Sequence, residues 1–193
     1  MNWVPAQRTN YQQRLLVQRV HTFTHAVYGT LTITRQQKTQ NNQTITFRLR
    51  LVPPNNQPPL ENSCQIIVTN NDTDALRPGS TLGVGGGIGT HRLPQGQRQL
   101  IGGVTFGYSM IDISTPVDLS GRKIIYLIHH VAAQACIDLG IPTFIVTNIV
   151  NPGLIQVCLN CGMRDAIYPN SYQGSATQVA NQGRQRALGD GWN

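Results

Sequence analysis

The sequence predicts one domain that mixes α and β structure, in the α/β or α+β class, and three observations lead to this prediction. The chain has 193 residues, which suffices for one core and is short for two. Its first half shows the two-residue alternation of strands. Its second half holds a helix, an apolar strand and a second helix in succession. We therefore expect a single domain, residues 1–193, with a mixed, mostly antiparallel central sheet flanked by helices.

Residues 1–98 are expected to be a β-rich half. Residues 11–20 show a short helical periodicity, and the polar segment 36–43 suits a hairpin loop between two strands. Residues 53–62 hold four prolines and should form a loop. The segments rich in β-branched residues or with period-two alternation are predicted strands: residues 23–35, 44–52 and 64–69.

A glycine-rich segment, residues 83–89, invites comparison with nucleotide-binding loops. It fails the dinucleotide fingerprint because Ile88 stands where a glycine belongs, and no Lys followed by Ser or Thr completes a P-loop. A flexible loop or a strand bulge is favoured over a phosphate site.

Residues 99–170 are expected to form the second half of the domain. Residues 99–115 are β-prone, with glycines that permit a bend. Residues 120–139 repeat apolar side chains at helical spacing, and Gly140 stands where a C-terminal cap belongs.

A buried strand and a second helix follow in the predicted order. The apolar run 143–150 is typical of a strand covered on both faces. The second helix is predicted at residues 152–160, with Asn151 as its N-cap. One more strand is expected from Tyr168 onward, and residues 171–193 are polar and are predicted to be a flexible tail.

The charge of the chain is strongly positive. The formal net charge is +7, and all but two of the 15 basic residues are Arg. Arginine binds phosphate through paired hydrogen bonds, so an Arg-rich surface favours a polyanionic partner such as tRNA or DNA. A general charge bias without a partner is the alternative. No apolar window of membrane-spanning length occurs, and the start lacks an apolar signal core, so a cytoplasmic protein with no membrane contact is expected.

The four cysteines give little support to a metal site. Cys158 and Cys161 are closely spaced, but no second pair of ligands stands at matching spacing. We expect buried free thiols and no metal.

Residues around the second helix carry a pattern known from one family. A helix ends at Gly140, an apolar strand follows, and Asn151 stands seven residues before Cys158 and eleven before Gly162. This order and spacing resemble the acyl-CoA-binding half of the GNAT N-acyltransferases, over about residues 102–163. The resemblance implies a GNAT-like fold, with acetyl-CoA or another acyl-CoA as cosubstrate.

The resemblance also implies where the cosubstrate binds. A helix start presents free backbone N–H groups and a positive dipole end to an anion. The family binds the CoA pyrophosphate there, and its pantetheine arm enters a gap where two neighbouring strands part. The matching positions in this chain are Ser120, Gly121, Arg122, Lys123, Ile124, Ile125 and Asn151 for the phosphates, and Ile113, Ser114 and Thr115 for the arm.

The chain departs from the family at three positions. Lys123 and Ile125 replace the two glycines of the phosphate loop, so side chains crowd the approach of the backbone to a phosphate. Cys158 replaces the tyrosine that protonates the leaving thiolate, and a thiol or a water molecule would have to take that role.

Asp112 is the candidate general base. It lies on the β-prone segment that would line the cleft, and a carboxylate there can take the proton of an incoming amine. Tyr108 shares its face at period two. An Asp at a strand end or a turn is the structural alternative. The candidate catalytic set is therefore Asp112, Cys158 and Tyr108.

Two functions follow as hypotheses. The first is an N-acyltransferase that moves an acyl group from acyl-CoA to an amine, for which the charge favours aminoacyl-tRNA or a DNA base. The second is a catalytically inactive GNAT-like module that binds nucleic acid or a protein partner. A toxin fragment delivered into a target cytoplasm is compatible with either.

Overall fold

The computed structural model describes residues 16–37, 44–68, 82–84, 87–89, 103–107, 119, 121–140, 143–146, 149, 152–166 and 170–193. Its strands are β1 (Arg19–His25), β2 (Gly29–Arg35), β3 (Thr44–Val52), β4 (Leu60–Val68), β5 (Leu82–Val84), β6 (Gly87–Gly89), β7 (Gly103–Gly107), β8 (Thr143–Val146), β9 (Arg164–Asp165) and β10 (Tyr172–Ser175). Its helices are α2 (Ile125–Asp138), α3 (Pro152–Asn160) and α4 (Ala176–Gly189).

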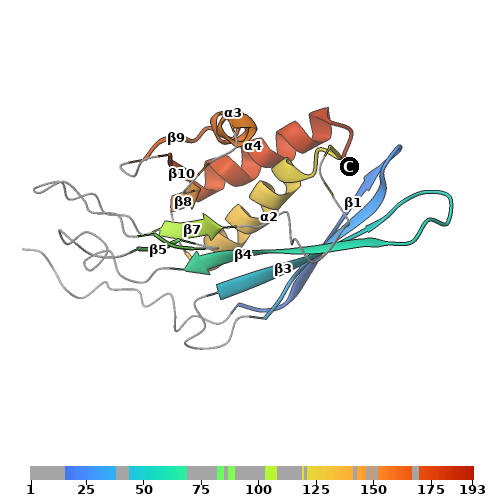
Figure 1. Cartoon of the computed structure of the whole chain (residues 1–193), viewed down its shortest axis with the longest axis horizontal. Coiled ribbons are helices and arrows are strands. Elements are labelled where there is room, and N and C mark those ends of the chain that lie inside the picture. Colours follow the sequence, from blue (N-terminus) through green and yellow to red (C-terminus); the bar gives the residue numbers. More distant parts are fainter. Residues whose placement is uncertain are drawn as a thin grey trace, which may run out of the picture.

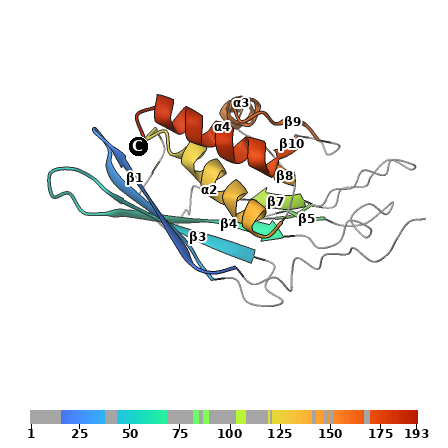
Figure 2. The same ribbon diagram turned by 180° about the vertical axis from the view of Figure 1, so that it is seen from behind.

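One curved sheet with a layer of helices makes up the described fold. Eight strands form the sheet in the order β1-β2-β3-β4-β7-β8-β10-β9, and β5 and β6 pair separately. Neighbouring strands of the sheet are antiparallel except for β7 and β8, which run parallel. The three labelled helices gather on one side of the sheet (Figures 1 and 2). The prediction of a mixed, mostly antiparallel sheet with helices is confirmed.

The alternation in residues 44–52 sets the buried face of β3. Ile45, Phe47, Leu49 and Leu51 are all buried, and the residues between them lie on the opposite face. The strand has the bounds that the sequence predicts.

Three other predictions for the first half need correction. The helix predicted at residues 11–20 is wrong where the chain is described, because Arg19 and Val20 belong to β1, an edge strand that pairs with β2. Residues 23–35 are interrupted by a turn at 26–28, and β1 and β2 form a hairpin there. The proline-rich loop is also shorter than predicted, since β4 already begins at Leu60. Leu82–Val84 and Gly87–Gly89 pair as a short antiparallel hairpin.

Helix α2 is buried on most sides because the sheet lies on one side and α4 on the other. Its buried residues include Leu127, Val131 and Ala135 on one stripe and His129 on another. Gly140 follows with a φ of +70°, a conformation that glycine adopts without strain, as predicted for the C-terminal cap. Among the described residues, no helix combines the length and apolar character that a membrane span requires.

The last residues form a helix that packs into the core, so the prediction of a flexible tail at residues 171–193 is wrong. β10 pairs with β8 and β9, and Ser175 is the N-cap of α4: its side chain accepts a hydrogen bond from the backbone N–H of Gln178. Ala176, Ala180 and Ala187 are small and buried. They allow α4 to approach α2 closely, so a polar sequence still supplies a packed helix face.

Candidate functional site

The described residues hold only part of the predicted acyl-CoA site. Tyr108, Asp112, Ile113, Ser114, Thr115, Ser120 and Asn151 lie outside them. Gly121, Arg122, Lys123, Ile124, Ile125 and Cys158 lie inside them. The helix predicted at residues 120–139 begins at Ile125, and the turn before it carries the predicted phosphate-loop residues.

Strands β7 and β8, the pair expected to part around the pantetheine arm, are hydrogen-bonded wherever both are described. Their register runs from Gly103 opposite Thr143 to Phe106 opposite Val146. Helix α2 supplies the crossover connection that two parallel strands require. A gap between these strands is therefore absent over the described part, and the residues at which they were predicted to separate lie beyond it.

The turn before α2 has an unusual backbone. Gly121 and Lys123 have φ angles of +72° and +59°, in the left-handed region, which costs a residue with a Cβ roughly 1–2 kcal/mol. Lys123 thus keeps the backbone conformation that a glycine favours, at the position where the family resemblance expects a glycine. Ile124, in contrast, points inward and is 2 % exposed.

The C-terminal residues close over this turn. The indole Nε1 of Trp192 donates a hydrogen bond of 3.1 Å to the carbonyl of Arg122. The hydroxyl of Tyr28 donates to the carbonyl of Gly121 at 3.4 Å. Lys123 pairs with Asp190 at 3.2 Å, and its side chain is 55 % exposed. Because solvent screens this ion pair, it stabilises the closure only weakly.

No side chain of α2 itself offsets the positive end of the helix dipole at its start. The N-cap residue Ile124 makes no side-chain cap hydrogen bond, and the first turn has no acidic residue. Arg122 and Lys123 precede it. The arrangement is electrostatically suited to an anion.

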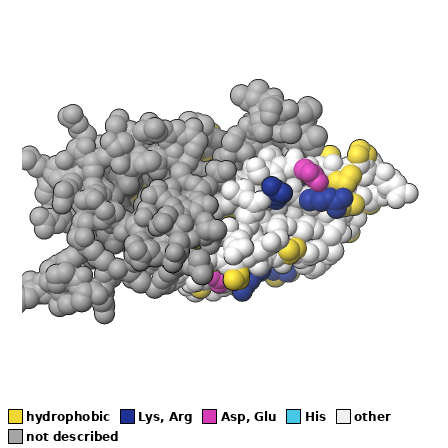
Figure 3. All heavy atoms as spheres, turned by 90° about the horizontal axis from the view of Figure 1, so that it is seen from below, with side chains coloured by type: hydrophobic (Ala, Val, Ile, Leu, Met, Phe, Trp, Pro, Cys, Tyr) yellow, Lys and Arg dark blue, Asp and Glu magenta, His cyan; other side chains and the backbone are white. Residues whose placement is uncertain are grey.

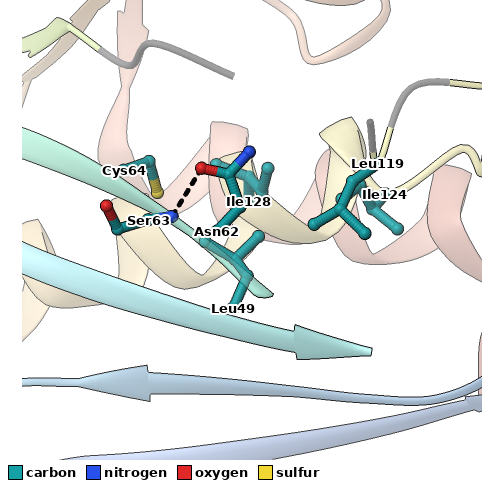
Figure 4. Close-up of a pocket in the computed structure, with 7 residues that line it drawn as sticks. All are labelled: Leu49, Asn62, Ser63, Cys64, Leu119, Ile124 and Ile128. Atoms are coloured by element: carbon teal, nitrogen blue, oxygen red, sulfur yellow. Dashed lines mark hydrogen bonds between the residues drawn. The ribbon is translucent and has the colours of Figure 1, made fainter. Parts of the chain in front are cut away.

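A small cavity lies between the start of α2 and the sheet (Figure 4). Its volume is about 10 Å³, close to the least that holds one water molecule. It has no room for a pantetheine chain. Its lining residues are Leu49, Asn62, Ser63, Cys64, Leu119, Ile124 and Ile128.

Cys158 is poorly suited to the role of proton donor. Its side chain is fully buried, and burial together with the neighbouring Cys161 raises its pKa to about 12. A thiol with this pKa gives up a proton less readily than an ordinary thiol. All four cysteines are free and buried, which confirms the prediction of buried thiols. Within the described part of the chain, no group of three or more His, Cys, Asp or Glu side chains is placed to hold a metal ion.

On the face of the sheet away from the helices, the described residues show no continuous arginine surface (Figure 3). Figure 3 shows the side of the sheet away from the helices, where the described side chains are mostly uncharged. Arg50 is paired there with Glu61 at 3.3 Å, and both are exposed. Arg35 is buried and forms an ion pair with Asp138 of α2.

Sequence reasoning missed this ion pair and the histidines beside it. The signal was the period of two in β2, which places Arg35 on the same face as the buried Leu31 and Ile33. A charged residue on a buried face requires a partner.

No protein-family model, curated protein or solved structure matches this chain. The strand topology alone assigns the fold to the α+β class, because one parallel strand pair lies in an otherwise antiparallel sheet.

Proposed function

We propose that this chain is a GNAT-type N-acyltransferase that moves an acyl group from acyl-CoA, in the first place acetyl-CoA, to an amine. The observation that carries the proposal is the backbone of Lys123, which has a φ of +59° where the family resemblance expects a loop glycine. This residue immediately precedes α2, the helix that joins the parallel strands β7 and β8. A strand, a phosphate loop and a crossover helix in this order are what acyl-CoA binding by this family requires.

The electrostatics support the same proposal. The first turn of α2 has no acidic residue and no side-chain cap, so its backbone N–H groups and dipole favour a pyrophosphate. Arg122 and Lys123 would add positive charge to this end. For a phosphate to bind at the turn, Lys123 must break its ion pair with Asp190 and pair with the ligand instead. The cost is small, because such an exposed ion pair contributes at most about 1 kcal/mol.

The reaction has a simple balance of bonds and protons. The amine nitrogen attacks the thioester carbonyl, a C–N bond forms, and the C–S bond breaks. Asp112 is the candidate for taking the proton from the amine, and Tyr108, which period two predicts on the same strand face, is the third member of the candidate set. Because the thiol of Cys158 is buried and weakly acidic, we assign the protonation of the leaving thiolate to water.

The acceptor that we propose is an amine carried by a nucleic acid, such as aminoacyl-tRNA or a DNA base. The net charge of +7 supports this choice, because a basic protein attracts a polyanion and loses that attraction with added salt.

A second candidate is a module of the same fold that binds nucleic acid without using acyl-CoA. The closure of the turn by Trp192 and Asp190 favours it. The pairing of β7 with β8 over their described length favours it as well. In that case the turn before α2 is a structural junction, and the basic residues bind phosphates of the nucleic acid.

Thermal unfolding with and without acetyl-CoA separates the two candidates. Ligand at one hundred times its dissociation constant stabilises the native state by about 2.7 kcal/mol, which raises the melting temperature by roughly 5–11 °C in a chain of this size. An unchanged melting temperature with every CoA ester would reject the acyltransferase. Salt-dependent binding of tRNA or duplex DNA by the same sample would then support the binding module.

A pair of variants at one position tests the loop directly. Lys123→Gly and Lys123→Ala remove the same charge and differ only in the Cβ. If a phosphate approaches this backbone, the glycine variant should bind acetyl-CoA more tightly than the alanine variant. Equal affinities would show that the ligand does not approach the turn.

Turnover tests the candidate base. Asp112→Asn should reduce the release of free CoA thiol while leaving the acetyl-CoA-induced rise in melting temperature nearly intact. Unchanged turnover would remove Asp112 from the mechanism.

A further inference from the structure

A row of polar side chains lies between the edge strand β1 and the helices. β1 directs Arg19, His21 and Phe23 toward α2 and α4, as their contacts with Asp138, His130 and Arg184 show. On α2, His130, Gln134 and Asp138 follow one another at intervals of four residues and so share one face. We call Arg19, His21, Arg35, His130, Asp138 and Arg184 the polar seam.

The polar seam has an excess of positive charge. Arg35, which is 1 % exposed, pairs with Asp138 and donates two further hydrogen bonds to the carbonyl of Val17 at 3.1 and 3.3 Å. Burial raises the pKa of Asp138, but hydrogen bonds from Arg35 and Gln134 and the nearby arginine charges outweigh it and hold the pKa below its usual value. Asp138 is therefore an anion that Arg35 already neutralises.

Arg19 is the surplus cation at one end of the polar seam. A single guanidinium nitrogen, Nη1, lies 3.3 Å from Asp138, and the side chain is 48 % exposed. Its other guanidinium nitrogens carry N–H groups that can donate hydrogen bonds to an oxyanion arriving from solvent.

His21 stands beside Arg19 with an unused ring nitrogen. Its Nε2 is buried and has no hydrogen-bond partner within the described part of the chain, and a buried polar atom without a partner is costly. The ring stacks on Phe23, with the ring centroids 6.5 Å apart. Burial, and then the charges of His130, Arg35 and Arg19, lower the pKa of His21 to about 4 against the opposing charge of Asp138.

His130 and Arg184 complete the other end of the polar seam. His130 donates from Nδ1 to the carbonyl of Ala180 at 2.8 Å, which fixes its tautomer. Arg184 lies over the ring of Phe23, 5.4 Å from its centroid, and donates to the carbonyl of Trp192. Phe23 lies four positions after Arg19 on β1, or about 13 Å along the strand, so one small ion can reach Arg19 and His21 but not Arg184.

We propose that the polar seam is a binding site for a phosphate group, in which Arg19 and the Nε2–H of His21 donate hydrogen bonds to its oxygens. The site is separate from the turn before α2 and does not depend on acyl-CoA. Arg184 is placed for a second phosphate of the same ligand, which fits a chain of phosphates better than a single ion.

Imidazole NMR of the full chain titrated with inorganic phosphate tests this proposal, with sodium chloride at matched ionic strength as the reference. We expect saturable shifts of the His21 ring with phosphate and a rise in the pKa of His21, because a bound anion favours the protonated imidazole. Chloride should cause neither change.

Variants assign the binding to the polar seam. Arg19→Gln should weaken phosphate binding about tenfold, the loss expected for one charge-assisted hydrogen bond. Arg50→Gln is the matched control, since Arg50 is similarly exposed and lies on β3 paired with Glu61; this variant should bind phosphate as the unchanged chain does. Equal responses to phosphate and chloride, or normal affinity in Arg19→Gln, would overturn the site, whatever acetyl-CoA does.

Discussion

Replacing Trp192 with alanine tests whether the last residues of the chain belong to the core. The indole is fully buried and lies 5.0 Å from the ring of His25 and 6.2 Å from the ring of Tyr28, centroid to centroid. Its Nε1–H donates a hydrogen bond to the carbonyl of Arg122, so the substitution removes both a large apolar contact and a hydrogen bond. The next residue, Asn193, exchanges two backbone hydrogen bonds with Thr24 of β1.

The magnitude follows from these contacts. Truncating a buried tryptophan to alanine costs about 3–5 kcal/mol, and the lost hydrogen bond accounts for about 1 kcal/mol within that range. The melting temperature should therefore fall by roughly 6–20 °C in a chain of this size.

Urea unfolding followed by far-UV circular dichroism measures the effect without relying on tryptophan fluorescence. Leu188→Ala is the control, because this α4 side chain is 47 % exposed and its loss should change stability by no more than about 0.5 kcal/mol. A cost below about 1 kcal/mol for Trp192→Ala would refute the packing of the C-terminal residues over the turn before α2.

Three further outcomes follow from the packing of the core. Stability should fall as the pH drops from about 6.5 to about 4, because burial lowers the pKa of His129 to about 4 and the unfolded chain takes up the proton first. His129→Leu should reduce the change in unfolding free energy over this pH range by up to about 3 kcal/mol, measured by urea unfolding at each pH, and an unaltered pH dependence would contradict this. Arg35→Met should cost roughly 3 kcal/mol in the same assay, because Asp138 loses its buried partner and keeps only Gln134 and the half-exposed Arg19, and Asp138→Asn should recover part of that loss in the double variant; strict additivity of the two losses would argue against coupling. Ser175→Ala should cost about 0.5–1 kcal/mol because it removes the N-cap of α4; the cost is small because the capping hydrogen bond, at 3.4 Å, is long. Hydrogen exchange at the amide of Gln178 should become faster, and unchanged protection would refute the cap.

Local sequence patterns were sufficient to predict those strands and helices whose apolar residues or end signals follow a regular spacing. The alternation of residues 44–52 predicts both the bounds of β3 and its buried face. The bounds of α3 follow from Pro152 at its first position and the glycine after its end. In these segments the local preference and the tertiary environment agree.

The helix at the end of the chain was missed because its buried face is built from small residues. Ala176, Ala180, Gly183 and Ala187 recur at helical spacing, but they add little to an apolar pattern. A Cβ at Gly183 would lie 2.9 Å from the carbonyl oxygen of Tyr126, so the glycine permits the close contact with α2. The close approach of the two helices depends on tertiary packing, which a count of apolar residues does not reveal.

The acyl-CoA site itself stays a prediction. The family spacing directed attention to the turn before α2, and the left-handed Lys123 is compatible with it. The closure by Trp192 and Asp190 could not be foreseen, because it joins residues that are about 70 positions apart in the sequence. His21 and Asp138 are likewise brought together only by the contact of β1 with α2.

A crystal structure of the chain with a non-hydrolysable acetyl-CoA analogue tests the acyltransferase proposal most directly. We expect the pyrophosphate at the backbone of residues 121–125, with Lys123 released from Asp190, and the pantetheine arm running toward the ends of β7 and β8. An analogue bound elsewhere, or a turn still closed by Trp192 and Asp190 with no ligand at saturating concentration, would contradict it.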